Sequence, residues 1–136
     1  MHTILIIGLL GLAAAQETPP TSVEGRWINP TRSVIIDIAA CGSALCGTVQ
    51  WASAQAKQDA SKGTATLVGT QLLTDLQPKR DMWEGKLFVP DQKMHVEAKL
   101  DPAGDQQLRV SGCAVGGLVC DSQLWTRAEG PLPTSD

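Results

Sequence analysis

Residues 94–100 read Met94-His95-Val96-Glu97-Ala98-Lys99-Leu100, an unbroken alternation of apolar and polar side chains. Successive side chains of a β-strand point to opposite faces, so this stretch predicts a half-buried antiparallel strand. Its apolar members are expected to face a core, and its polar members, His95 among them, are expected to face solvent. The same alternation recurs at Val34, Ile36 and Ile38.

Six further segments have the β-branched or aromatic content and the flanking turn residues that are typical of strands. They are residues 25–28, 45–51, 67–73, 84–89, 107–112 and 122–127. Together with the two alternating stretches they make about eight strands, the number at which a small barrel can close. The sequence therefore predicts an all-β fold, a small antiparallel up-and-down barrel. Residues 52–63, with Ser53 as the N-cap, predict at most a short exposed helix that lacks an apolar face.

The first and the last predicted strands carry a matched pair of motifs. Gly25-x-Trp27 lies on the first predicted strand, and Gln123-x-Trp125-x-Arg127 lies on the last. First and last strands become neighbours when a sheet closes on itself, so the Arg127 guanidinium can lie across the Trp27 indole. Such a stack contributes about 0.5 to 2 kcal/mol and excludes water. We therefore predict that Trp27 and Arg127 form a seal at one end of the barrel.

The chain contains four cysteines, arranged as two close pairs: Cys41 and Cys46, Cys113 and Cys120. In an exported protein they predict two disulfides, for which three connectivities are possible. We favour the local pairing, because short hairpin loops bring such neighbours within bonding distance with little strain. A zinc site is the alternative, although the spacings are looser than those of usual zinc knuckles.

The N-terminal residues predict export. An apolar run over residues 4–12 is followed by Ala13-Ala14-Ala15, which is typical of a signal peptide and its cleavage site. The run is too short to span a bilayer. We expect residues 1–15 to be a cleaved signal peptide, 16–23 a flexible lead-in, 24–128 the barrel domain and 129–136 a disordered tail. The predicted location is periplasmic or secreted, with no membrane span.

Charge narrows the range of partners. The net charge is −3 at pH 7, and the charged residues are scattered along the chain. Without a basic stripe or a polybasic segment, nucleic acid is not an expected partner.

Five motifs follow one another in order along the chain. They are Gly25-x-Trp27, Cys41…Leu45-Cys46-Gly47, Trp83-Glu84-Gly85-Lys86-Leu87…Pro90, Leu108-x-Val110-x-Gly112-Cys113 and Gln123-x-Trp125-x-Arg127. This ordered set resembles the bacterial domain-of-unknown-function family 2147. The resemblance implies an exported protein with a lipocalin-like antiparallel barrel and no established reaction. Barrels of that kind commonly hold small apolar ligands, which is an analogy from fold alone.

Catalytic chemistry is not indicated by any residue pattern. Beyond residue 15 the only histidine is His95, which shares the predicted solvent face with Glu97 and Lys99. That position predicts an ordinary solvated side chain rather than a catalytic or metal-binding one. There is no serine in a nucleophile elbow and no second histidine to complete a zinc set. We therefore expect a non-enzymatic protein without a metal or a cofactor.

Two functions remain open. The barrel could bind a small apolar molecule in the bacterial envelope. Alternatively, it could be a protein-interaction or inhibitor module that engages an envelope or host protein through loops such as residues 52–63 or 76–83. An inward cavity of roughly a few hundred Å3 would favour the first function, whereas a solid core with an ordered projecting loop would favour the second. The residues expected to line such a cavity are Ile36, Ile38, Trp51, Trp83, Met94, Val96, Ala98 and Trp125.

Overall fold

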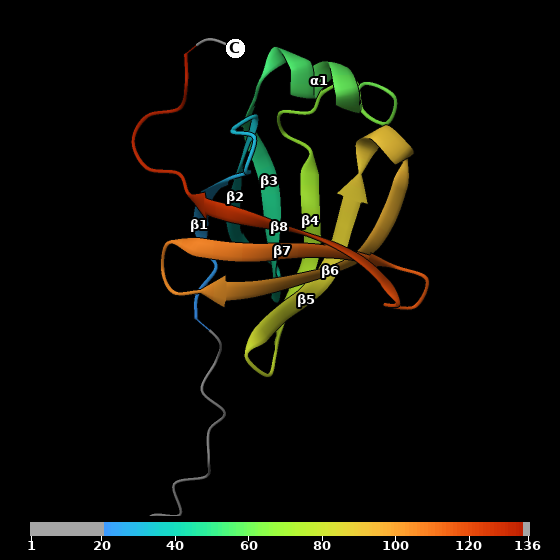
Figure 1. Ribbon diagram of the computed structural model, residues 1–136. Coiled ribbons are helices and arrows are strands. Elements are labelled where there is room, and N and C mark those ends of the chain that lie inside the picture. Colours follow the sequence, from blue (N-terminus) through green and yellow to red (C-terminus); the bar gives the residue numbers. More distant parts are fainter. Residues whose placement is uncertain (1–20, 135–136) are drawn as a thin grey trace, which may run out of the picture.

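Consecutive strands pair antiparallel along the whole chain, and the last strand returns to pair with the first, which closes a barrel (Figure 1). The computed structural model describes residues 21–134, so the signal peptide expected at residues 1–15 lies outside the described residues. Its elements are β1 (Gly25–Ile28), β2 (Val34–Cys41), β3 (Ala44–Ala52), α1 (Ala54–Ala60), β4 (Gln71–Lys79), β5 (Met82–Val89), η1 (Pro90–Gln92), β6 (Met94–Ala103), β7 (Gln107–Ala114) and β8 (Val119–Arg127). The predicted all-β antiparallel barrel of eight strands is confirmed.

The core lies between two layers of the barrel wall. In Figure 1 the strands β6 to β8 cross in front of β2 to β4, and buried residues of both layers form one core cluster. Ile36, Ile38, Leu73, Leu100 and Leu108 are each at most 1% exposed. Within the described residues, no polar or charged residue is buried, so apolar side chains fill the interior of the barrel.

One strand differs from its prediction. Residues 67–73 were expected to be extended, but β4 runs over Gln71–Lys79. The preceding residues form a turn instead, in which the Thr70 hydroxyl donates to the Thr66 carbonyl at 2.6 Å and Gly69 has a φ of +94°. Hydroxyl-to-backbone bonds of this kind compete with strand pairing, and an apolar pattern does not reveal them.

The predicted helix is present as α1, but it is less isolated than expected. Ser53 caps it, because its hydroxyl oxygen accepts a hydrogen bond from the Ala56 amide at 3.1 Å. The expectation that the helix has no apolar face to pack is wrong, since Ala60 is only 7% exposed. A Cβ on Gly63 would overlap the Pro90 carbonyl, so the chain after the helix lies directly against η1, and both lie at the same end of the barrel (Figure 1).

The opposite end of the barrel is closed by Trp27 and Arg127. These residues are register partners of β1 and β8, and Arg127 Cζ lies 4.0 Å from the centre of the Trp27 ring. The Trp27 indole, 1% exposed, donates to the Val23 carbonyl at 2.9 Å. Arg127 Nε donates to the Asp105 carbonyl at 2.8 Å. Gly25, with a φ of +114°, makes room for the guanidinium, because a Cβ there would lie 2.6 Å from Arg127 Nη1.

The chain just before β1 packs against this closed end. Val23 is fully buried, and the Thr21 carbonyl accepts a hydrogen bond from Trp83 Nε1 at 3.2 Å. The expectation of a flexible lead-in is therefore wrong for residues 21–23, because the indoles of the barrel need backbone acceptors there. After β8, Arg26 donates to the Gly130 carbonyl, which tethers the start of the expected tail to the barrel wall.

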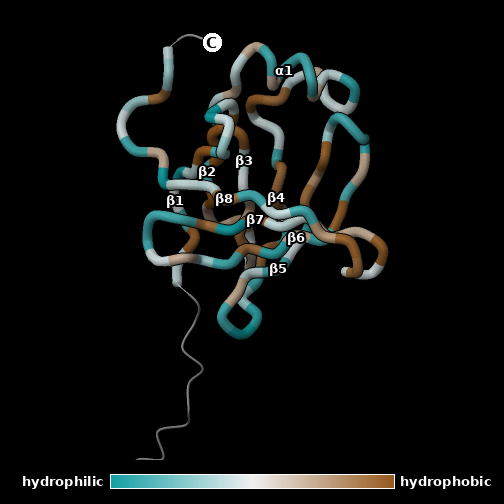
Figure 2. Tube along the Cα trace, viewed as in Figure 1, coloured by the Kyte–Doolittle hydropathy of each residue, from teal (hydrophilic) through white to brown (hydrophobic). Residues whose placement is uncertain are grey.

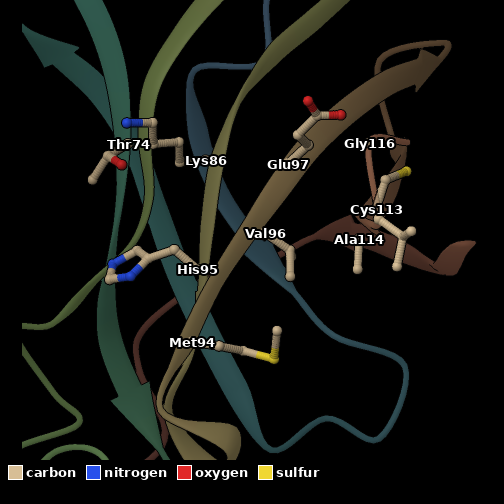
Figure 3. A pocket seen from close by; sticks show the side chains of 10 residues that line it. Thr74, Lys86, Met94, His95, Val96, Glu97, Cys113, Ala114 and Gly116 are labelled. Carbon is tan, nitrogen blue, oxygen red and sulfur yellow. The ribbon is translucent and has the colours of Figure 1, made fainter. Parts of the chain in front are cut away.

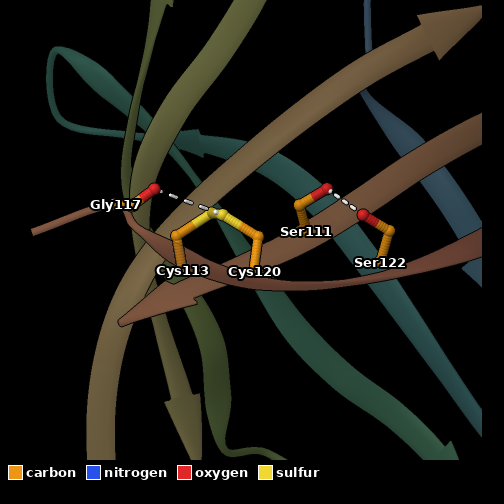
Figure 4. Close-up of a disulfide and its surroundings, with 5 residues drawn as sticks. All are labelled: Ser111, Cys113, Gly117, Cys120 and Ser122. Atoms are coloured by element: carbon orange, nitrogen blue, oxygen red, sulfur yellow. Dashed lines mark hydrogen bonds between the residues drawn. A yellow bond between two sulfur atoms is a disulfide. The ribbon is translucent and has the colours of Figure 1, made fainter. Parts of the chain in front are cut away.

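Both disulfides join local pairs, as predicted: Cys41 with Cys46, and Cys113 with Cys120. The first spans the β2–β3 turn, and the second joins register partners on β7 and β8. Figure 4 shows the second bond beside a hydroxyl pair, Ser111 with Ser122, whose oxygens lie 2.7 Å apart. The two bonds fix hairpins at opposite ends of the barrel, and the described residues contain no free thiol.

Candidate functional site

A cup of about 430 Å3 opens at the end of the barrel opposite the seal. Its walls come from β5, β6, β7 and β8, with Gln92 of η1 at the rim. The lining residues are Leu87, Val89, Gln92, Met94, Val96, Val110, Gly112, Ala114, Val119, Asp121, Gln123 and Trp125. Inward-facing positions of four neighbouring strands thus converge on one hollow, which is where small barrels hold ligands.

The shape of the cup follows from the strand register. Gly112 of β7 lies between Ala98 of β6 and Asp121 of β8. A Cβ on Gly112 would approach Leu87 Cδ2 to 3.0 Å and Val96 Cγ2 to 3.2 Å. The missing side chain therefore lets the walls close below the cup, where Ala98 and Leu100 are fully packed.

Three polar side chains interrupt the apolar lining. Trp125 Nε1 donates to Gln123 Oε1 at 3.1 Å, which fixes the amide against the wall and orients the indole, itself 8% exposed. Asp121 lies two positions before Gln123 on β8 and therefore faces the same inner side of the strand. Gln92 completes the set at the rim.

Only some of the residues predicted to line a cavity do so. Met94, Val96 and Trp125 line the cup. Three others, Ile36, Ile38 and Ala98, lie in the solid core, each 1% exposed. Their assignment to a cavity is wrong, because the barrel is filled at their level.

The other two tryptophans do not line the cup either. Trp83 packs against the core from the side and donates to the Thr21 carbonyl near the closed end. Trp51 is the register partner of Ile35, which alternates with Ile36, so Trp51 lies on the outer side of the wall. Its predicted inward direction is wrong because β3 carries an extra residue, and the register shifts between Ile35 and Ile36.

A second hollow, an outer groove of about 760 Å3, crosses the outer surface and the rim beside β6 (Figure 3). In Figure 3 His95 projects from β6 to the side opposite Met94 and Val96. His95 is exposed and stacks on Phe88 with ring centres 4.9 Å apart. No group of three or more potential metal ligands occurs within residues 21–134. The groove shares Met94, Val96 and Ala114 with the cup, but it is more open and carries charges of both signs, Lys86 and Glu97.

Sequence reasoning missed most of the β7 and β8 contribution to the cup. The signal was nevertheless present in the period-two series Gly112-x-Ala114 and Val119-x-Asp121-x-Gln123-x-Trp125. Pairing Cys113 with Cys120 sets the register of the hairpin, so Gly112 must oppose Asp121. A disulfide between register partners can therefore serve as a marker of which residues share an inner face.

Comparison with known proteins places the chain in a family. No curated protein and no solved structure matches it, and the helices within residues 21–134 include none long and apolar enough to cross a membrane. One family model, described as "Uncharacterized protein conserved in bacteria (DUF2147)", matches residues 25–127. Those limits coincide with the first residue of β1 and the last residue of β8. The match confirms the resemblance drawn from the ordered motifs, and the chain belongs to this bacterial family.

Proposed function

We propose that the barrel binds a small, predominantly apolar molecule in the cup. The observation that carries this proposal is the cup itself, about 430 Å3 in volume and walled by inward aliphatic side chains of four strands. That volume lies within the usual range for ligand sites, about 300 to 1,000 Å3. Each CH2 group of a ligand that leaves water for such a wall contributes about 0.8 kcal/mol.

The proposal is for a binding protein rather than an enzyme. Nucleophilic and general-base chemistry needs a hydroxyl, thiol, imidazole or amine beside its partner. The described lining of the cup offers none of these groups, and its one carboxylate, Asp121, has no second titratable residue beside it. His95 is not part of that lining, and it projects to the side of β6 opposite Met94 and Val96 (Figure 3).

We also propose that the protein works outside the cytoplasm, in the periplasm or as a secreted protein. Two disulfides in so small a barrel support this location, because such bonds form and persist in oxidising compartments. A ligand encountered there would come from the cell envelope or its surroundings.

Titration with N-phenyl-1-naphthylamine, a neutral apolar dye that fluoresces on leaving water, tests the proposal. We expect saturable binding of one dye per chain. Ala114→Trp fills the cup and should weaken binding at least about 100-fold, because the dye loses burial worth several CH2 groups. Ala103→Trp is the matched control, since Ala103 is exposed at the end of β6, away from the cup. Equal dye binding by the two variants, or no binding by the unmodified protein, would refute the proposal.

Interaction with another protein is the second candidate, and one observation favours it. The β7–β8 loop exposes Val115 by 70% and Leu118 by 84%, and Val119 at the start of β8 is 60% exposed. This loop is one of the brown, hydrophobic loops in Figure 2. By contrast, the β4–β5 turn, named above as a candidate contact, is hydrophilic. A partner that covered this apolar loop would remain attached when the protein is purified gently.

A further inference from the structure

We propose that the cup selects amphiphiles whose polar end is a cation bearing N–H groups, such as an alkylammonium, with the Asp121 carboxylate as its anchor. This inference rests on the proposed function and adds to it the chemical class of the ligand. It follows from the place of one charged side chain in an otherwise apolar and neutral lining.

The direction of Asp121 is fixed by its strand. Cys120 and Ser122 point to the same side of the β7–β8 hairpin (Figure 4), and Asp121 alternates with them. Its register partner Gly112 faces the cup residues Leu87 and Val96. Asp121 therefore shares the inner face with Val119 and Gln123, and all three line the cup. Opposite it stands Gly112, so no side chain from β7 separates the carboxylate from the space of the cup.

The Asp121 carboxylate has no partner in the described part of the protein. It accepts no side-chain hydrogen bond there, and the one ion pair within residues 21–134 joins Lys79 to Glu84 on the β4–β5 hairpin. None of the residues that line the cup is a lysine, arginine or histidine. Asp121 is exposed where it lines the cup, and a negative charge beside an apolar hollow whose lining holds no cation favours a cationic ligand and disfavours an anionic one.

Gln123 places a second polar group next to this anchor. Its Oε1 is occupied by Trp125 Nε1, so its amide N–H groups are the ones left to face a ligand. These N–H groups find no acceptor on an ammonium, which has only donors, so an ammonium would bind through the Asp121 carboxylate. The aliphatic body of the ligand would then lie against Leu87, Val96 and Val110.

Competition against the bound dye tests this selectivity with three probes of equal chain length: octylammonium, octanol and octanoate at neutral pH. We expect octylammonium to displace the dye at a concentration about tenfold lower than octanol requires, and octanoate to be the weakest. Asp121→Asn should abolish the advantage of octylammonium over octanol, with each displacement referred to that variant's own dye affinity. Asp81→Asn is the control, because it removes the same charge from the β4–β5 turn, remote from the cup.

The outcomes separate the two proposals. If the dye binds but the three probes compete equally, or if Asp121→Asn keeps the preference for octylammonium, the cation selectivity is wrong and cup binding stands. Loss of the preference in Asp81→Asn as well would assign it to overall charge and would also overturn the inference. Absence of dye binding by the unmodified protein would overturn both proposals.

Discussion

Trp27→Ala is expected to lower the free energy of unfolding by about 3 to 5 kcal/mol, the range for removing a fully buried large aromatic side chain. The indole is 1% exposed, donates to the Val23 carbonyl and lies under the Arg127 guanidinium. Its loss leaves a cavity, an unpaired carbonyl and a guanidinium without its ring. Chemical denaturation followed by circular dichroism would measure the change.

Two further variants make this prediction specific. Trp51→Ala removes an indole from the outer side of the wall, where the side chain is half-buried, and should cost about 2 kcal/mol or less. A double-mutant cycle of Trp27→Leu with Arg127→Gln should show coupling of about 0.5 to 2 kcal/mol, because either change removes the same cation–π contact. Equal losses for the two tryptophans, or additive effects in the cycle, would contradict the role given to the seal.

Gly85→Ala should lower the free energy of unfolding by about 3 kcal/mol. A Cβ at Gly85 would lie 2.5 Å from the Thr74 carbonyl oxygen and 2.9 Å from the Asp75 carbonyl oxygen. These are backbone atoms of β4, at the point where its register with β5 shifts and Asp75 has a φ of +55°. Relief of the overlap requires the two strands to separate. A lower midpoint of chemical denaturation would measure the loss of stability.

Gly47→Ala is the matched control for this prediction. A Cβ at Gly47 would meet only side-chain atoms, the nearest being Leu73 Cδ1 at 3.1 Å. A leucine can adjust by a few tenths of an ångström, so we expect a loss of about 1 kcal/mol or less. If Gly47→Ala proved as harmful as Gly85→Ala, the close approach of β4 to β5 would not be the cause.

Much of the fold could be predicted because it depends on local patterns. The alternation over 94–100 predicted β6, and the two cysteine pairs sit in hairpins whose short loops leave little choice of partner. Closure of the barrel was predictable because a stack of Arg127 on Trp27 requires the first and last strands to be neighbours.

The cup was less accessible to sequence reasoning because its position depends on register. Strand alternation indicates which residues face inward, but not the level at which the barrel stops being filled. Ile36 and Ala98 follow the same alternation as Val96, yet only Val96 lies close enough to the open end of the barrel to line the cup. Trp51 was misassigned because one extra residue in β3 reverses every face beyond it.

The position of Asp121 in the cup was also hidden from sequence reasoning, because it depends on strand pairing. A carboxylate between Cys120 and Ser122 looks like an ordinary surface residue until the pairing of Cys113 with Cys120 puts it on the inner face. Its position in the cup is a product of topology and not of composition.

Native mass spectrometry of the protein, purified from bacterial cells without denaturation, tests ligand binding in the cup most directly. The account predicts a small-molecule adduct on the intact, doubly disulfide-bonded chain, and loss of that adduct in Ala114→Trp but not in Ala103→Trp. A chain that carries no small molecule and instead retains another protein, or an adduct that persists in Ala114→Trp, would contradict it.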